Sequence, residues 1–137
     1  MAGEPILVVD DQAVNLELAR VLLTIAGYGV RTATDAEQAL RALAEGYRPR
    51  LILMDVQLPG MDGLELTRRL KADPVMDGTR IVALTAYAMT GDEARVLAAG
   101  CDGYIAKPID TRTFAGQVAA ALGATSGSGA SSGPADG

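Results

Sequence analysis

Short runs of apolar residues alternate with longer segments of helical periodicity about five times along this chain. Continuous apolar runs are typical of strands buried on both faces, and apolar residues repeated every three or four positions are typical of helices that cover a sheet. The runs predict strands at 5–9, 28–33, 50–54, 80–84 and 103–106. The periodic segments predict helices at 13–26, 34–45, 62–71, 90–99 and 110–122.

Local signals predict where several of these helices begin and end. The segments TDAE at 34–37 and TGDE at 90–93 match capping boxes, and Asp110 is a suitable cap for the last helix. Pro74 is expected to close the third helix, since proline cannot continue one. Strands that alternate with helices predict an α/β fold with a five-stranded parallel sheet, right-handed crossovers and helices on both faces.

Polar residues stand at or just past the ends of four of the predicted strands. They are Asp10, Asp11, Asp55, Thr85 and Lys107. The carboxyl ends of parallel strands share one edge of the sheet, where ligands bind in a crevice, so we expect these side chains to converge. Three carboxylates, a hydroxyl and an ammonium group in one crevice predict a divalent-cation site that handles a phosphoryl group.

Each of these residues has a plainer explanation when it is taken alone. Aspartates at strand ends commonly cap helices or turns, and threonine is a common strand residue. Lys107 would be an ordinary surface lysine, and its neighbour Pro108 only biases it away from helical geometry. The adjacent charges of Asp10 and Asp11 repel each other, however, and a bound cation or the dipole of the following helix would offset that cost. For Asp55, the roles of cation ligand, nucleophile or both remain open.

Composition narrows the class of protein. A chain of 137 residues that is 49% hydrophobic is long enough to form one domain with its own core. The formal net charge of −5, without any basic run, argues against nucleic acid as a partner. The apolar stretches are too short for a membrane span, and the first residues lack the basic segment of a signal peptide, so we expect a cytoplasmic protein.

Two residue counts restrict the chemistry further. The chain has no histidine, so it cannot supply a Ser-His or Cys-His catalytic pair and cannot itself carry phosphohistidine. Any histidine in its chemistry must come from a partner. The single cysteine, Cys101, has no partner for a disulfide or a zinc site and is interpreted as a small packed side chain.

The composition changes near the C-terminus. Residues 123–137, GATSGSGASSGPADG, are rich in glycine and serine and contain almost no apolar side chains. Such a segment cannot repay the entropy of ordering, so we expect a folded domain at 1–122 and a flexible tail at 123–137. A linker to a further domain and an artificial addition remain open as explanations of the tail.

The motifs ILVVDD, LILMDVQLPGMDGLE, IVALTAYAM and GYIAKPI, in this order, resemble response-regulator receiver domains of two-component and phosphorelay signalling over residues 5–122. The resemblance implies a flavodoxin-like (βα)5 fold, doubly wound, with sheet order 2-1-3-4-5. It implies that Asp55 is phosphorylated by the phosphohistidine of a partner. Mg²⁺, with Mn²⁺ as a substitute, would be bound by the side chains of Asp11 and Asp55, through water by Asp10, and by the backbone carbonyl of Gln57.

The same resemblance assigns further roles. Lys107 would contact the phosphoryl group, Thr85 would move to hydrogen-bond it, and the ring of Tyr104 would turn inward as Thr85 moves. The plainer alternative for Tyr104 is a partly buried strand tyrosine. Gln57 and Tyr87 occupy positions that tune the lifetime of the phosphoryl group in this family, and a bulky Tyr87 would screen attacking water. These movements would switch the face formed by the fourth helix, the fifth strand and the fifth helix.

Finer features of the sequence indicate a subtype and a way of acting. Asn15, the QLPGMDGLE segment and the ALTAYAM run resemble receivers of hybrid histidine kinases and stand-alone regulators of the DivK type, although Gln12 stands where many of those have asparagine. The expected partners are a histidine kinase or histidine phosphotransfer protein and a downstream protein target, with neither nucleic acid nor membrane. The chain would be a monomer or a phosphorylation-dependent dimer.

Two other classes of function compete with a signalling receiver. A small hydrolase would use Asp55 as its nucleophile, but Gln57 stands where such an enzyme needs a general acid or base. A phosphate-independent docking module is disfavoured by the intact set of polar residues at the strand ends. We therefore expect a protein that is not an enzyme beyond its self-catalysed phosphoryl acceptance and autodephosphorylation.

Overall fold

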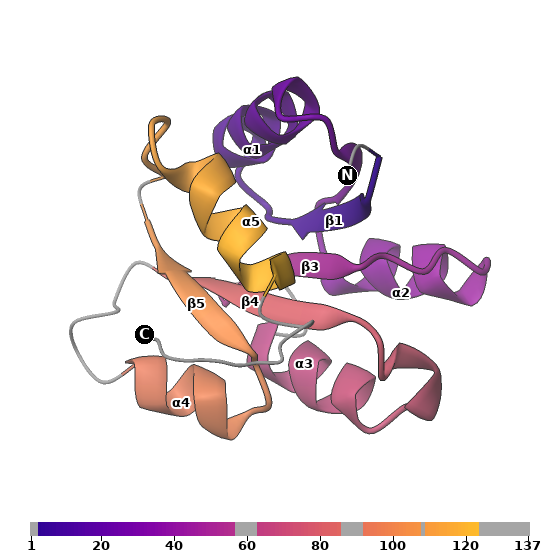
Figure 1. Ribbon diagram of the computed structural model, residues 1–137. Helices are drawn as coiled ribbons and strands as arrows, with labels where there is room; N and C mark the ends of the chain where they lie inside the picture. The colour runs from indigo at the N-terminus through magenta and orange to yellow at the C-terminus, as the bar shows by residue number, and fades with distance from the viewer. Residues whose placement is uncertain (1–2, 57–62, 86–91, 108, 124–137) are drawn as a thin grey trace.

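The structure is a computed structural model, and it describes residues 3–56, 63–85, 92–107 and 109–123. Strands and helices alternate through this part of the chain (Figure 1). The strands are β1 (Pro5–Val9), β2 (Gly29–Ala33), β3 (Leu51–Asp55), β4 (Arg80–Thr85) and β5 (Gly103–Ala106). The helices are α1 (Ala13–Ile25), α2 (Ala36–Ala44), α3 (Gly63–Lys71), the short 3₁₀ helix η1 (Pro74–Met76), α4 (Asp92–Ala98) and α5 (Phe114–Gly123).

The strands form a single parallel sheet in the order β2-β1-β3-β4-β5, which confirms the predicted α/β fold and its strand order. Helices α1 and α5 cover one face of the sheet, and α2, α3 and α4 cover the other (Figure 1). Right-handed crossovers between parallel strands require helices on both faces in this strand order. The result is a three-layer arrangement with the sheet in the middle.

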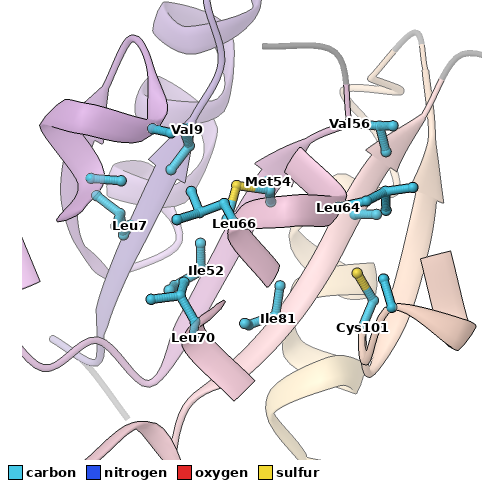
Figure 2. Close-up of a cluster of buried hydrophobic side chains, with 14 of the residues drawn as sticks. Leu7, Val9, Ile52, Met54, Val56, Leu64, Leu66, Leu70, Ile81 and Cys101 are labelled. Atoms are coloured by element: carbon cyan, nitrogen blue, oxygen red, sulfur yellow. The ribbon is translucent and has the colours of Figure 1, made fainter. Parts of the chain in front are cut away.

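The core consists of two hydrophobic clusters, one on each face of the sheet. Successive side chains of a strand point to opposite faces, so Ile6 and Val8 pack beneath α1 and α5 while Leu7 and Val9 pack against the other helices. Figure 2 shows the second cluster, in which Leu66 and other α3 residues lie against the strands. Both faces of β1 and β3 are buried, which explains why their sequences are continuous apolar runs.

The second helix begins one residue later than its predicted capping box. Asp35 caps α2 in place of Thr34, because the Asp35 carboxylate accepts a hydrogen bond from the Gln38 amide at 2.8 Å. The Gln38 side chain in turn accepts from the Thr34 amide at 2.8 Å. The arrangement differs from a capping box, because the Gln38 side chain bonds to the amide of Thr34 and not to that of the cap residue Asp35.

The end of the third helix and the start of the last one also differ from prediction. Pro74 does not simply end α3, since it opens the 3₁₀ helix η1, which is capped by Asp73. The Asp110 carboxylate accepts from the Arg112 amide at 2.9 Å and stabilises a turn, and α5 begins only at Phe114. Residues 90 and 91 of the second predicted capping box, and residues 124–137 of the tail predicted at 123–137, lie outside the described residues, so the cap and the domain boundary stay predictions.

Among the helices that the structure describes, none has the length and apolar character that crossing a membrane requires.

Candidate functional site at the carboxyl edge of the sheet

The register of the sheet brings four strand ends to one place. Val9 pairs with Met54, so Asp10, which follows β1, lies beside the end of β3, where Asp55 is the last residue. Thr85 ends β4 and pairs with Ala106, and Lys107 follows directly. The order of strands therefore places side chains from positions as distant in the sequence as 10 and 107 around one edge.

Lys107 connects the first and third strands electrostatically. Its Nζ lies 3.1 Å from Oδ2 of Asp55 and 3.4 Å from Oδ2 of Asp10. The Lys107 side chain is 17% exposed, against 6% for that of Asp55 and none for that of Asp10. Charges that are so little exposed are poorly screened by water, so the attraction between Lys107 and the two carboxylates is stronger than that of an ion pair at the surface.

Asp10 is the most deeply buried polar residue of the site. Its Oδ1 accepts a hydrogen bond from the Gln12 amide at 2.8 Å. Within the described part of the chain, its Oδ2 has no hydrogen-bond partner, although Lys107 contributes charge from 3.4 Å. A buried carboxylate oxygen with unused acceptor capacity is costly, and a bound cation or water would satisfy it.

The carboxylates form a group that fits a divalent cation. One oxygen from each of Asp10, Asp11 and Asp55 lies within 4.8 Å of the other two. Asp10 and Asp55 are buried and Asp11 is exposed, so the group is open to solvent on one side. Oxygen donors with an open side match Mg²⁺, which commonly keeps some of its waters and binds few carboxylates. The adjacent pair and the distant Asp55 therefore converge as expected.

Thr85 and Lys107 are linked through the backbone. The Lys107 amide donates to the Thr85 carbonyl at 2.8 Å, and Thr85 is only 2% exposed. Tyr104, three residues before Lys107 on the edge strand β5, is 38% exposed. The hydroxyl and the ammonium group thus sit on neighbouring strand ends, whereas the tyrosine ring has substantial access to solvent.

Two residues that the sequence analysis assigned to this site, Gln57 and Tyr87, lie outside the described residues. A further residue, Gly63, was not predicted: it is buried at the start of α3, directly against the backbone of Asp55. The clue in the sequence was a glycine at the first position of a helix, where it is an unfavourable helix former.

Comparison with known proteins identifies the family to which this chain belongs. The sequence pattern of the response regulator receiver domain matches residues 6–119. The chain belongs to this family. It is 41% identical over 118 residues to the polar-differentiation response regulator DivK of Brucella anthropi, covering 86% of this chain and 95% of that protein. This agrees with the resemblance drawn from its motifs.

Solved receiver structures have the same fold. The receiver domain of a sensor histidine kinase from Pseudomonas aeruginosa superposes with a TM-score of 0.79 and 38% identity over 89% of this chain and 99% of that one. That structure has a magnesium ion coordinated in its active-site cleft. The chemotaxis response regulator CheY4 of Vibrio cholerae superposes with a TM-score of 0.79 and 28% identity over 88% of this chain and 99% of that one.

Membership of the family establishes the broad role of this receiver. It is a domain of two-component signalling, a class of signalling proteins that are not classical enzymes. Receiver domains bind Mg²⁺ in an acidic pocket, and the group of three aspartates in this receiver forms such a pocket.

Proposed function

We propose that this receiver takes a phosphoryl group from a partner's phosphohistidine onto the Asp55 carboxylate and thereby controls the binding of other proteins. The observation that carries the proposal is the position of Asp55. It is 4% exposed, 3.1 Å from the ammonium group of Lys107, and grouped with Asp10 and Asp11. A carboxylate held in this way is a nucleophile beside both a counter-charge and a cation-binding group.

The reaction is a transfer between two partners. A carboxylate oxygen of Asp55 forms a new P–O bond while the P–N bond to the partner's imidazole breaks, and the imidazole nitrogen leaves with the electron pair and takes up a proton. The chain lacks histidine and so cannot be the donor. Phosphoryl transfer depends mainly on in-line positioning and on neutralising the charge of the equatorial oxygens.

The residues divide these tasks. The side chains of Asp11 and Asp55, Asp10 through water and the carbonyl of Gln57 would hold Mg²⁺ or Mn²⁺. When bound, this cation would neutralise charge on the phosphoryl oxygens. Lys107 would supply the second positive charge, and its contacts with Asp10 and Asp55 support this role.

The switch would begin at Thr85. A phosphoryl group on Asp55 adds charge and strong acceptor oxygens, which would draw the Thr85 hydroxyl toward them. The ring of Tyr104, which is 38% exposed, would turn inward into the space that Thr85 leaves. A coupling of a few kcal/mol between this movement and the face formed by α4, β5 and α5 changes populations tenfold or more.

The lifetime of the phosphoryl group would depend on residues beside the site. Gln57 and Tyr87 would control the approach of water to the aspartyl phosphate, and a bulky Tyr87 would slow hydrolysis. We therefore infer slow autodephosphorylation. A phosphoryl lifetime of only seconds, measured by the decay of the labelled protein, would contradict this assignment.

The partner that brings the phosphoryl group would be a histidine kinase or a histidine phosphotransfer protein, as is general for the family. Helix α1 offers a surface for it. Val14, four residues after Asp10, is 78% exposed, and with Ala13, Leu18 and Val21 it forms a shallow apolar patch. A helix that carries the donor histidine would bury this patch and bring its imidazole to Asp55. From the likeness to the polar-differentiation response regulator DivK, we propose polar differentiation as the output.

One experiment tests the proposal. The protein is incubated with Mg²⁺ and a small phosphodonor, and wild type is compared with Asp55→Asn by intact mass. We expect one phosphoryl adduct per wild-type chain and none on the variant. The absence of an adduct on wild type would favour a phosphate-independent docking module, and rapid multiple turnover would favour a hydrolase.

A further inference from the structure

Helix α3 begins in direct contact with the backbone of Asp55. A Cβ added at Gly63 would lie 2.2 Å from the Asp55 carbonyl oxygen, 3.0 Å from its carbonyl carbon and 3.0 Å from Cα of Val56. Contacts this short are strongly repulsive, so any side chain at this position requires the helix or the Asp55 backbone to move by roughly 1 Å. Gly63 is not in the left-handed region of φ. Glycine is therefore required because there is no room for a Cβ atom, and not because the backbone adopts a conformation that only glycine favours.

The backbone that follows Asp55 is held from two sides. The Val56 amide donates to the Leu84 carbonyl at 3.2 Å, which extends the pairing with β4. The Val56 carbonyl accepts from the Gly63 amide at 2.9 Å, and the absence of a side chain on Gly63 permits this close approach. The peptide unit that follows Asp55, the proposed phosphoryl acceptor, is therefore fixed between β4 and the first residue of α3.

A buried threonine secures the first turn of α3. The Thr67 hydroxyl donates to the Gly63 carbonyl at 2.8 Å, and Thr67 is fully buried. Its oxygen also lies 3.7 Å from the sulfur of Cys101. A threonine in a helix can bond through its hydroxyl to the carbonyl four residues earlier, and here that bond acts on the residue that touches Asp55.

We propose that Gly63 is a positioning residue for phosphorylation. The close contact of α3 with the Asp55–Val56 backbone determines where the Asp55 carboxylate lies relative to Asp10, Asp11 and Lys107. This inference rests on the proposed function. The carboxylates are within 4.8 Å of one another and Lys107 is 3.1 Å from Asp55, so a displacement of about 1 Å at the end of β3 changes the distances from Asp55 to the other three side chains.

The test compares Gly63→Ala with wild type by two readouts at a temperature where both are folded. The first is the dissociation constant for Mn²⁺, measured from the signal of free Mn²⁺ in electron paramagnetic resonance. The second is the rate of adduct formation with a small phosphodonor at saturating Mg²⁺. We expect Mn²⁺ binding to weaken and phosphorylation to slow, each on the order of tenfold or more.

Two controls separate positioning from loss of stability. Gly116→Ala adds the same methyl group to α5, where nothing lies within 4 Å of the new Cβ, and we expect no loss in either readout. Leu70→Ala truncates a buried side chain at the far end of α3 and lowers stability without touching the Asp55 backbone. We expect its Mn²⁺ affinity to stay within twofold of wild type.

If Gly63→Ala does not fold, Thr67→Val carries the test, because it keeps the shape of the side chain and removes only the hydroxyl that holds the Gly63 carbonyl. We then expect weaker Mn²⁺ binding than in Leu70→Ala.

The Mn²⁺ affinities decide the outcome. Affinities within twofold of wild type for the folded Gly63 variant, or for Thr67→Val in its place, overturn the inference. A wild type that binds Mn²⁺ but forms no adduct overturns the proposed function alone, and the affinities still decide the role of Gly63. A wild type that binds no Mn²⁺ overturns both.

Discussion

The ammonium group of Lys107 lies 3.1 Å from one carboxylate oxygen of Asp55, with both side chains largely withdrawn from solvent. The same nitrogen is 3.4 Å from Asp10, so one positive charge offsets two buried negative charges. Lys107 thus neutralises charge within the acidic pocket, and under the proposed function it would also face the added phosphoryl group. These two roles have separate experimental consequences.

Replacing Lys107 with glutamine is expected to destabilise the metal-free protein. Asp10 and Asp55 would keep their buried charges without a counter-charge, so the free energy of unfolding should fall by about 2 kcal/mol or more. Mg²⁺ should restore more stability to the variant than it adds to wild type. Urea unfolding in chelator and in saturating Mg²⁺ measures both effects.

The matched control for Lys107→Gln is Arg112→Gln, since the Arg112 side chain is 88% exposed and its ion pair with Asp110 is at the surface. This control should change the free energy of unfolding by less than about 0.5 kcal/mol. An unchanged stability of Lys107→Gln in chelator would show that the contact with the two carboxylates contributes nothing net.

Asp11→Asn is expected to weaken the binding of Mg²⁺ without destabilising the metal-free protein. Asp11 is the exposed member of the acidic group, and removing its charge reduces repulsion with Asp10 and Asp55. The thermal midpoint in chelator should stay the same or rise, and the increase produced by Mg²⁺ should shrink. Differential scanning calorimetry with and without Mg²⁺ checks this.

A variant at another exposed aspartate, Asp77→Asn, serves as the comparison for Asp11→Asn. It should retain the full increase in thermal midpoint on adding Mg²⁺. The idea that Asp11 is a cation ligand would be wrong if Asp11→Asn and Asp77→Asn responded equally to Mg²⁺.

Asp102→Ala should lower stability but leave the binding of Mg²⁺ intact. The Asp102 carboxylate accepts from the Ile81 amide at 2.8 Å and forms ion pairs with Lys71 at 2.8 Å and Arg80 at 3.4 Å. It thus ties β4, β5 and α3 together at the amino edge of the sheet, away from the acidic pocket. Loss of a partner for a backbone amide and two cations should cost about 2 kcal/mol in urea unfolding.

The Mg²⁺ dissociation constant of Asp102→Ala should remain within about twofold of wild type, because the strand ends that carry the site are untouched. A large loss of Mg²⁺ affinity in this variant would mean that the two edges of the sheet are coupled, contrary to this expectation.

The Cys101 thiol should react slowly and contribute a pH-dependent increment to stability. Burial raises the pKa of Cys101, an effect that the nearby Thr67 hydroxyl opposes in part. A pKa that is higher in the folded than in the unfolded state stabilises the fold below the ordinary thiol pKa. That stability is lost as the pH rises through the folded value. The advantage of wild type over Cys101→Ala in urea unfolding should therefore be smaller at about pH 10 than at about pH 7.

Accessibility of the thiol gives an independent check. An aromatic disulfide reagent should label native Cys101 far more slowly than the urea-unfolded chain, because the residue is only 6% exposed. Equal labelling rates would show that the α4–β5 turn opens readily in the native protein.

Much of the fold could be predicted because local patterns of apolar and polar residues indicate its strands and helices. Continuous apolar runs marked the strands, and their alternation with helical periodicity was sufficient for a parallel sheet. The boundaries of elements were less certain. Thr34 and Asp35 are both good caps, and the choice between them depends on which carboxylate or hydroxyl reaches the Gln38 amide, which is a matter of three-dimensional geometry.

The sequence by itself determined which chemical groups stand at the strand ends, and the absence of histidine means that these residues cannot themselves supply the phosphohistidine. Only the tertiary structure decided how those groups are related. Lys107 pairs with Asp10 as well as Asp55, Asp10 is wholly buried while its neighbour Asp11 is exposed, and Gly63 rests on the Asp55 backbone. The physical reason is that local preferences act over a few residues, whereas burial and charge contacts arise between segments that meet only when the sheet forms.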